Sequence, residues 1–526
     1  MQETNKPPPT GIWLALSGGG MRAALFHYGA IKRLYELGLL QDVTAISATS
    51  GGAIVAALIG LHGPFTKDEP DNWLVFEKSL LTAATKGVMG PTMWSFIAWI
   101  CLILSVCIGL INLGLTLSID SSPLLNHLFL ALFTVCLISI FIVAIGMGKD
   151  HINNRNYSQS QLQPEIAPDP QSILELQIGW AERIRILFNT LLIQFDPGYV
   201  RWYFLNKYLF NDALMTDFKT SPKIFLCASD LKNSRELVFS PKLIGEISAK
   251  GVRRLWRQHR YDVADEETLY ATVQGENVPV STGVAASSAL PPVFTAVPVF
   301  VDGELVANCI DGGVIDNNAL NITRQMAKYA DEDHADSLGR TFANTVGHVL
   351  AIDAAPPIVS DNRYFWLRSS TMLRISDLLH NRQIHAFLED LSDIQHLFKV
   401  SARAIALTIK PDETSELGDP LVAIRAAKIR THFDRFSSIE CAVLSYLGYY
   451  WANKWALSEY THRKQFIENI PLRSIENILP EEFSPGKDSL QVKNMLDHLK
   501  YSHVKLSLCR WLFRSWRSIT AHMKLS

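Results

Sequence analysis

Ser50 stands in a sequence context where a serine could act as a nucleophile. It lies within the segment A-T-S-G-G at 48–52, after the apolar run 43–46 and before the apolar run 53–58. This order predicts a strand, a sharp turn and a helix with the serine on the turn, which is the arrangement of a nucleophile elbow. Small residues at 48, 51 and 52 allow the tight turn. The helix that follows directs its positive end at the hydroxyl.

A glycine-rich turn upstream could stabilise negative charge. It follows the apolar run 12–16 and precedes a helix that we expect to begin at Ala24. Backbone N–H groups in such a turn are unobstructed and can bind a phosphate, or the oxyanion of an ester under attack. Arg22 could hold this loop or add positive charge. The three glycines of the turn are Gly18, Gly19 and Gly20.

Asp311 is the preferred candidate for the base, because a hydroxyl is a poor nucleophile until a base takes its proton. It begins the turn Asp311-Gly312-Gly313, and glycines let two backbones approach closely. Three other side chains are weaker candidates. His27 is expected to pack as a helix residue, and Asp316 and Asp353 are the alternative carboxylates.

These three elements, in this order, resemble the patatin-like phospholipase family. The family pattern is a glycine-rich oxyanion loop, then G-x-S-x-G, then D-G-G or D-G-A; here the segments read G-G-G-M-R, A-T-S-G-G and D-G-G. Flanking segments at 286–294 (A-S-S-A-L-P-P-V-F) and 314–318 (V-I-D-N-N) strengthen the resemblance. It covers most of residues 11–354, apart from one insertion, and continues weakly to about residue 450. Ala48 stands where the family usually has glycine.

The resemblance implies a Ser50–Asp311 dyad that cleaves carboxylic esters through an acyl-enzyme. The oxyanion hole would comprise Gly18, Gly19, Gly20 and Arg22. The implied substrate is a phospholipid, a lysophospholipid or a neutral glyceride, and no metal or other cofactor is implied. Acyl transfer to a lipid alcohol stays open as a variant of this chemistry.

The insertion consists of two long apolar stretches, at about 93–115 and 124–147, joined by a short polar connection. No Asp, Glu, Lys or Arg occurs in 87–119 or in 121–148, and each stretch exceeds the ~20 residues needed to span a bilayer as a helix. Lysines and arginines flank the pair, and the only charged residue between the two stretches is an acid. We therefore expect a transmembrane hairpin in an integral membrane protein whose catalytic domain is cytoplasmic. A buried hairpin in a soluble core is the alternative.

The positioning elements predict an α/β fold, namely a three-layer α/β/α hydrolase domain with a mainly parallel sheet. The hairpin interrupts this domain, and the C-terminal region is expected to be mostly helical. The expected divisions are 11–90 (hydrolase, first part), 91–149 (hairpin), 170–356 (hydrolase, second part), 357–497 (helical region) and 498–526 (basic amphipathic helix).

Charge and composition limit the partners. The formal net charge is −2, so no global basic field favours nucleic acid. Residues 499–526 carry basic side chains and tryptophans but no acid, which is typical of a segment that binds anionic lipid headgroups. The alternative is a solvated terminal helix packed on the domain. The oligomeric state does not follow from the sequence.

Two other interpretations remain at this point. The stretch 18–23 fits G-x-G-x-x-A, which favours a dinucleotide-binding membrane protein that uses the Gly18–Gly20 loop, although the acid expected after the second strand is missing. The chain could also be a structural membrane protein with an inactive hydrolase domain.

Overall fold

A computed structural model describes the greater part of the chain. The described residues are 10–66, 69–87, 104–109, 111, 123–147, 197–232, 234–241, 243–248, 251–253, 273–274, 278–291, 294–301, 304–329, 344–355, 387, 389–396, 400–412, 415–431, 435–500 and 502.

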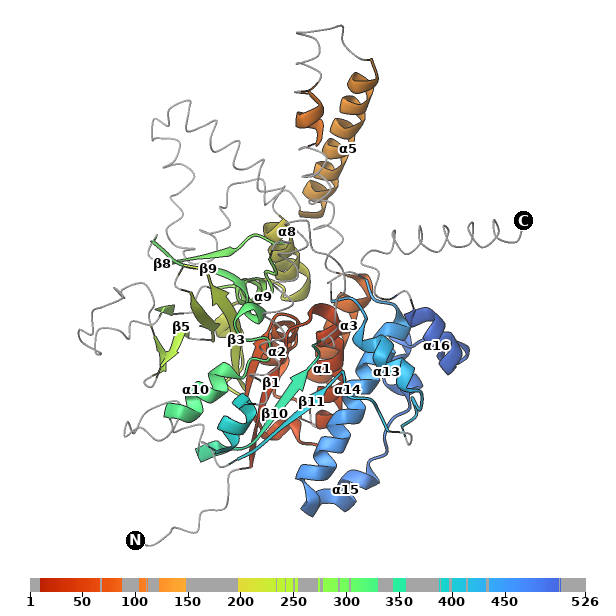
Figure 1. Ribbon diagram of the computed structural model, residues 1–526. Coiled ribbons are helices and arrows are strands. Elements are labelled where there is room, and N and C mark those ends of the chain that lie inside the picture. The colour runs from red at the N-terminus through yellow and green to blue at the C-terminus, as the bar shows by residue number, and fades with distance from the viewer. Residues whose placement is uncertain are drawn as a thin grey trace, which may run out of the picture.

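A mixed β-sheet forms the centre of the molecule (Figure 1). Its strand order is β11-β10-β1-β2-β3-β4-β5-β6, and the first five of these are mutually parallel. Antiparallel strands extend the sheet beyond β3, where β4 and β9 both pair with it. The strands are β1 (Gly11–Leu16), β2 (Val43–Thr49), β3 (Lys223–Asp230), β4 (Arg235–Phe239), β5 (Leu243–Ser248), β6 (Gly251–Arg253), β7 (Val273–Gln274), β8 (Val297–Val301), β9 (Glu304–Asp311), β10 (Val346–Asp353) and β11 (Ser401–Ala406).

Helices lie on both faces of the sheet, so the predicted α/β class is confirmed. Helices α1, α2, α3, α9, α13 and α14 pack on one face, together with the side chains of Ile12, Leu14 and Leu16. Helix α10 and residues 389–396 pack on the other face with Trp13 and Ala15. Since β1 is buried on both sides, it is a continuous apolar run rather than an alternating one.

The larger helices begin and end as follows: α1 (Gly20–Glu36), α2 (Gly51–His62), α3 (Pro70–Lys86), α5 (Pro123–Met147), α8 (Pro197–Phe204), α9 (Val280–Ser287), α10 (Asn321–Tyr329), α13 (Pro420–Ala427), α14 (Ser438–Glu459), α15 (Lys464–Asn469) and α16 (Val492–Leu499).

The C-terminal region shares the core of the hydrolase domain. Strand β11 pairs with β10, and α14 packs along α1 in the same hydrophobic cluster. The two helices approach so closely that a Cβ at Gly29 would lie 1.8 Å from the Ser445 carbonyl, and one at Gly448 would lie 1.9 Å from the Phe26 carbonyl. Residues beyond 400, within the region 357–497 that the sequence predicted to be mostly helical, therefore help to hold the glycine turn.

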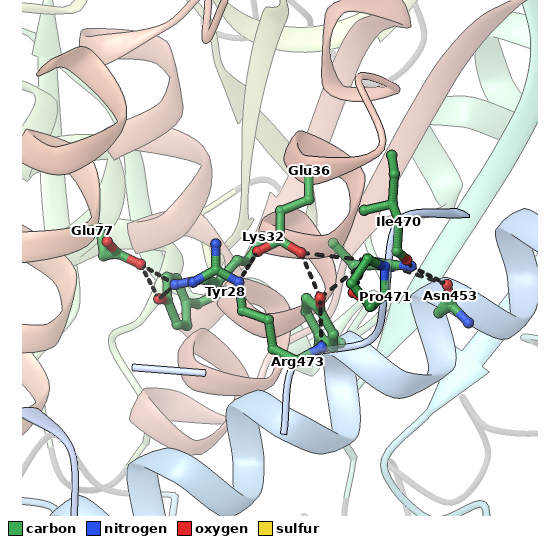
Figure 2. A network of polar contacts seen from close by, with 10 residues as sticks. Tyr28, Lys32, Glu36, Glu77, Asn453, Ile470, Pro471 and Arg473 are labelled. Atoms are coloured by element: carbon green, nitrogen blue, oxygen red, sulfur yellow. Dashed lines mark hydrogen bonds and ion pairs between the residues drawn. The ribbon is translucent and has the colours of Figure 1, made fainter. Parts of the chain in front are cut away.

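Polar contacts fasten the far half of α1 to its neighbours (Figure 2). Lys32 forms a buried ion pair with Glu77 of α3 at 2.5 Å, and Tyr28 donates to the same carboxylate. Arg473 pairs with Glu36 at 2.6 Å. These contacts orient α3 and the chain near residue 473 against α1, at the end of the helix remote from the glycine turn.

Helix α5 projects from the body and meets it near α8 (Figure 1). Residues 104–109 form a short helix beside it, where a Cβ at Gly109 would meet the Phe129 ring at 3.4 Å. Exposed apolar side chains of α5 include Leu124, Leu128, Leu130, Phe133, Val135 and Ile138. Most of the first predicted span, 93–115, lies outside the described residues, as does the basic segment 503–526.

A search of the described residues finds no helix that combines the length and the apolarity required to cross a membrane.

Candidate active site

Ser50 lies on the turn between β2 and α2, with φ 52° and ψ −114°. A positive φ is strained for a residue with a side chain, and such strain is typical of a functional turn. Position 51 requires glycine, because a Cβ there would lie 2.0 Å from the Gly20 carbonyl oxygen. Ala48 is fully buried within β2, where its methyl group packs in the core. The strand–turn–helix expected around the serine is therefore present.

Strand β3 aligns Ser50 with Asp311. Thr49, the last residue of β2, pairs with Cys227, whereas Asp311, the last residue of β9, pairs with Ala228. Strand β2 runs parallel to β3 and β9 runs antiparallel to it, so their carboxyl ends meet on the same side of β3. The side chain of Ser50 acts on the Asp311 carboxylate as a hydrogen-bond donor and so lowers the pKa of Asp311. The structure thus brings the predicted nucleophile and base together.

Asp311 is held in a mostly dry environment. It is 5% exposed and Ser50 is 6% exposed. Burial raises the pKa of Asp311 to about 6, although hydrogen bonds from the Gly313 amide (2.8 Å) and Ser50, and the charge of Arg201, act in the opposite direction. A carboxylate with this pKa is a stronger base than a free one and is still mostly ionised at pH 7.

The glycine turn lies against the elbow. A Cβ on Gly18 would be 3.3 Å from that of Ser50. The Gly18 amide donates to the Asn317 carbonyl at 2.7 Å. Among the described residues, by contrast, no acceptor is found for the amides of Gly19 and Gly20 at the start of α1. These two amides have the freedom that an oxyanion donor needs.

Arg22 is buried, and its guanidinium is held by backbone carbonyls. Its guanidinium donates to the carbonyls of Ala354 (2.7 Å), Ala427 (3.0 Å) and Ile429 (3.1 Å). Burial lowers the pKa of Arg22 to about 10, and Asp353 opposes this shift. Of the two roles expected for Arg22, its contacts favour holding the loop.

The alternative bases are engaged elsewhere. Burial lowers the pKa of His27 to about 3, and its Nε2 lies 3.1 Å from the Ile352 carbonyl, as expected of a packed helix residue. Asp316 accepts from the amides of Asn318 and Asn321 at the start of α10. Asp353 accepts from the Ala355 amide. Burial raises the pKa of both carboxylates.

Two residues beside the dyad were given no role by the sequence. The Ser287 hydroxyl accepts from the Ser50 amide at 2.9 Å and donates to the Cys227 carbonyl at 2.6 Å. Arg201, on α8, is buried and donates hydrogen bonds to Ala285 and Ser288, which flank Ser287 in the chain. Ser287 lies in a segment that the motif pattern singled out. The only sequence signal for Arg201 was its place directly before the three aromatic residues at 202–204.

Within the part of the chain that the structure describes, no group of three or more His, Cys, Asp or Glu residues could hold a metal ion.

The family model for patatin-like phospholipases matches residues 14–324, a stretch that contains the glycine turn, Ser50 and Asp311. The chain belongs to this family. Its members are serine-dependent lipid acyl hydrolases, and the predicted relationship is therefore confirmed.

Individual relatives match less of the chain. A patatin-like phospholipase domain-containing protein of Coccidioides immitis (strain RS) is 40% identical over 86 residues, which is 16% of this chain and 11% of that protein. Among solved structures, VipD from Legionella pneumophila aligns with 94% of this chain and 87% of its own, at 12% identity. The TM-score of this alignment is 0.28.

Proposed function

We propose that this protein is a membrane-anchored lipid acyl hydrolase that cleaves carboxylic ester bonds of phospholipids or lysophospholipids. The observation that carries the proposal is the meeting of the carboxyl ends of β2 and β9 at consecutive residues of β3, which brings Ser50 next to Asp311, a carboxylate whose pKa is raised to about 6. Ser50 attacks the ester carbonyl while Asp311 accepts its proton. The alcohol then leaves with that proton, and an acyl-enzyme remains. Asp311 next takes a proton from water as the water attacks the acyl group. It then passes this proton to the Ser50 oxygen, which leaves as the hydroxyl while the fatty acid is released.

The amides of Gly19 and Gly20 hold the oxyanion in this mechanism, because they stand at the positive end of α1 and are free to donate. Gly18 and Arg22 support the loop through their bonds to backbone carbonyls. The dinucleotide alternative has less support, since β2 ends at Thr49 without the acid that would bind a ribose.

The membrane anchor is assigned to the hairpin at 91–149. Support comes from the apolar side chains of α5 that face solvent in the isolated chain, with Leu124 76% exposed and Leu130 60% exposed. A row of exposed apolar groups on a projecting helix is costly in water and favourable in lipid. The flanking basic residues favour a catalytic domain on the cytoplasmic side. The basic segment 499–526 would bind anionic headgroups.

The test of the dyad is fatty-acid release from mixed phospholipid vesicles by the full-length protein. We expect Ser50→Ala and Asp311→Asn each to reduce release by at least about 10³-fold. Ser445→Ala is the matched control, because this buried hydroxyl has no hydrogen-bond partner among the described residues and belongs to α14. Asp353→Asn should cost much less than Asp311→Asn. Release that persists in Ser50→Ala would refute the proposed nucleophile.

The test of the anchor is vesicle flotation of Leu130→Lys, with Leu421→Lys as the control. Both leucines are on helix surfaces, 60% and 48% exposed respectively, but Leu421 is on α13. A lysine within the hydrocarbon costs about 2.5–3.5 kcal/mol, so only Leu130→Lys should bind vesicles more weakly. Cleavage of a soluble ester should be unchanged in both. Equal flotation of the two variants would exclude α5 as the anchor.

A further inference from the structure

Arg201 holds the segment that connects α9 to β8. Its guanidinium donates to the carbonyls of Ala285 (2.7 Å) and Ser288, and to the Ser288 hydroxyl at 3.3 Å. It also lies over the Phe294 ring, 4.0 Å from the centroid. The planar guanidinium therefore holds the last turn of α9 by several directed hydrogen bonds and a stacked ring contact. An ammonium group could not reproduce this geometry.

The same turn of chain carries the contacts to both members of the dyad. The Ser287 hydroxyl accepts from the Ser50 amide at 2.9 Å. The Ala289 carbonyl accepts from the Asp311 amide at 3.0 Å. The backbone amides of the nucleophile and the base are thus both hydrogen-bonded to one short segment. Arg201 is hydrogen-bonded to the same segment.

The charge of Arg201 also acts on the base. Burial of Asp311 raises its pKa, and the positive charge of Arg201 lowers it. No other charged side chain is found to act on Asp311 among the described residues. Arg201 keeps its proton at working pH, because guanidinium groups lose it only far above neutrality.

We propose that Arg201 is a positioning residue that aligns Ser50 with Asp311 through the 285–289 turn and favours the ionised form of the base. The inference rests on the proposed function, because alignment of the dyad matters only if the dyad reacts. A displacement of the dyad by about 1 Å can reduce the rate by about 10²-fold. A residue that keeps the 285–289 turn in place therefore has a large effect on the rate.

The experiment compares Arg201→Gln and Arg201→Lys with the wild type. The rate of fluorophosphonate labelling of Ser50 is measured from pH 5 to pH 9, and kcat and KM are measured on a soluble ester. We expect Arg201→Gln to lower labelling and kcat by about 10–100-fold with little change in KM. The acidic limb of its pH profile of labelling should move to higher pH. The reason is that Asp311 then lacks the nearby positive charge of Arg201, which lowers the pKa of Asp311. Arg201→Lys should keep the limb in place and still lose rate.

Arg33→Lys is the matched control. Arg33 is also a buried arginine that donates to backbone carbonyls, those of Ile470 (2.7 Å) and Pro471, but it lies about 20 Å along α1 from the glycine turn. This variant should lose thermal stability and keep its labelling rate and pH profile.

Each other outcome is decisive. If Arg201→Gln labels at the wild-type rate with an unmoved limb, the inference is wrong. If Arg201→Gln does not fold, Arg201→Lys decides, and a wild-type kcat in that variant overturns the inference. Equal rate losses in Arg201→Lys and Arg33→Lys would reduce Arg201 to a structural role. A wild-type protein that neither cleaves esters nor reacts with the fluorophosphonate overturns the proposed function itself.

Discussion

Gly20→Ala tests whether the C-terminal region supports the oxyanion loop. Gly20 has φ +59°, and a Cβ there would lie 1.4 Å from the carbonyl oxygen of Thr431. An ordinary contact needs about 3.4 Å, so this carbonyl must retreat by about 2 Å in a tightly packed interior. The positive φ adds about 1–2 kcal/mol of its own for a residue with a side chain.

Gly38→Ala separates these two effects. Gly38 has a similar φ of +71°, but a Cβ there would meet no atom within 4 Å. This variant should lose only the conformational part, about 1–2 kcal/mol, and keep its activity. Gly20→Ala should lose more stability, since the segment that it displaces is the one whose Ile429 carbonyl accepts from Arg22.

The assay is thermal unfolding together with kcat on a soluble ester. A loss of 1 kcal/mol lowers the Tm of a sizeable domain by about 2–4 °C. Disturbing one oxyanion donor costs about 10²–10³-fold in kcat, which we expect for Gly20→Ala alone. If Gly20→Ala matched Gly38→Ala in Tm and kept kcat within about threefold of wild type, both the close approach and the assigned role of the loop would be refuted.

Three further results are expected. The kcat should fall about tenfold per pH unit below pH 6, because the base must be ionised and Asp311 has a raised pKa of about 6; a pH–rate profile that is flat from pH 7 to pH 4 would contradict this. Asp311→Asn should stabilise the protein at pH 7 by up to about 3 kcal/mol, because burial penalises the ionised form there. The gain should shrink as the pH falls and disappear by about pH 3, below the unfolded pKa of about 3.9, where Asp311 is mostly protonated in both the folded and the unfolded chain. Calorimetry at the two pH values measures the difference. Ser287→Ala should lower both Tm and kcat, because it leaves the Ser50 amide and the Cys227 carbonyl without their partner at about 1–3 kcal/mol each, whereas Ser445→Ala should change neither.

Local sequence was sufficient to predict the elements around the site. The apolar runs at 12–16 and 43–46 form β1 and β2, and Ser50 lies at the start of α2 as expected. Helix α1 begins at Gly20, within the glycine turn, rather than at the expected Ala24. These predictions succeed because strand, tight turn and helix are each specified by neighbouring residues: short apolar runs, then small residues that allow the turn. The assignment of catalytic roles to these residues stays a prediction.

Which groups meet in the site depends on packing between segments far apart in the sequence. Ser50 and Asp311 are adjacent because β2 and β9 end at consecutive residues of β3, and a strand register over so large a sequence separation is not encoded locally. For the same reason the sequence did not reveal that Arg201 supports the turn at 285–289, or that Thr431 presses on Gly20. Neighbouring residues along the chain specify the chemical groups of the site and the local turns that carry them. Packing between distant segments determined how those groups are aligned.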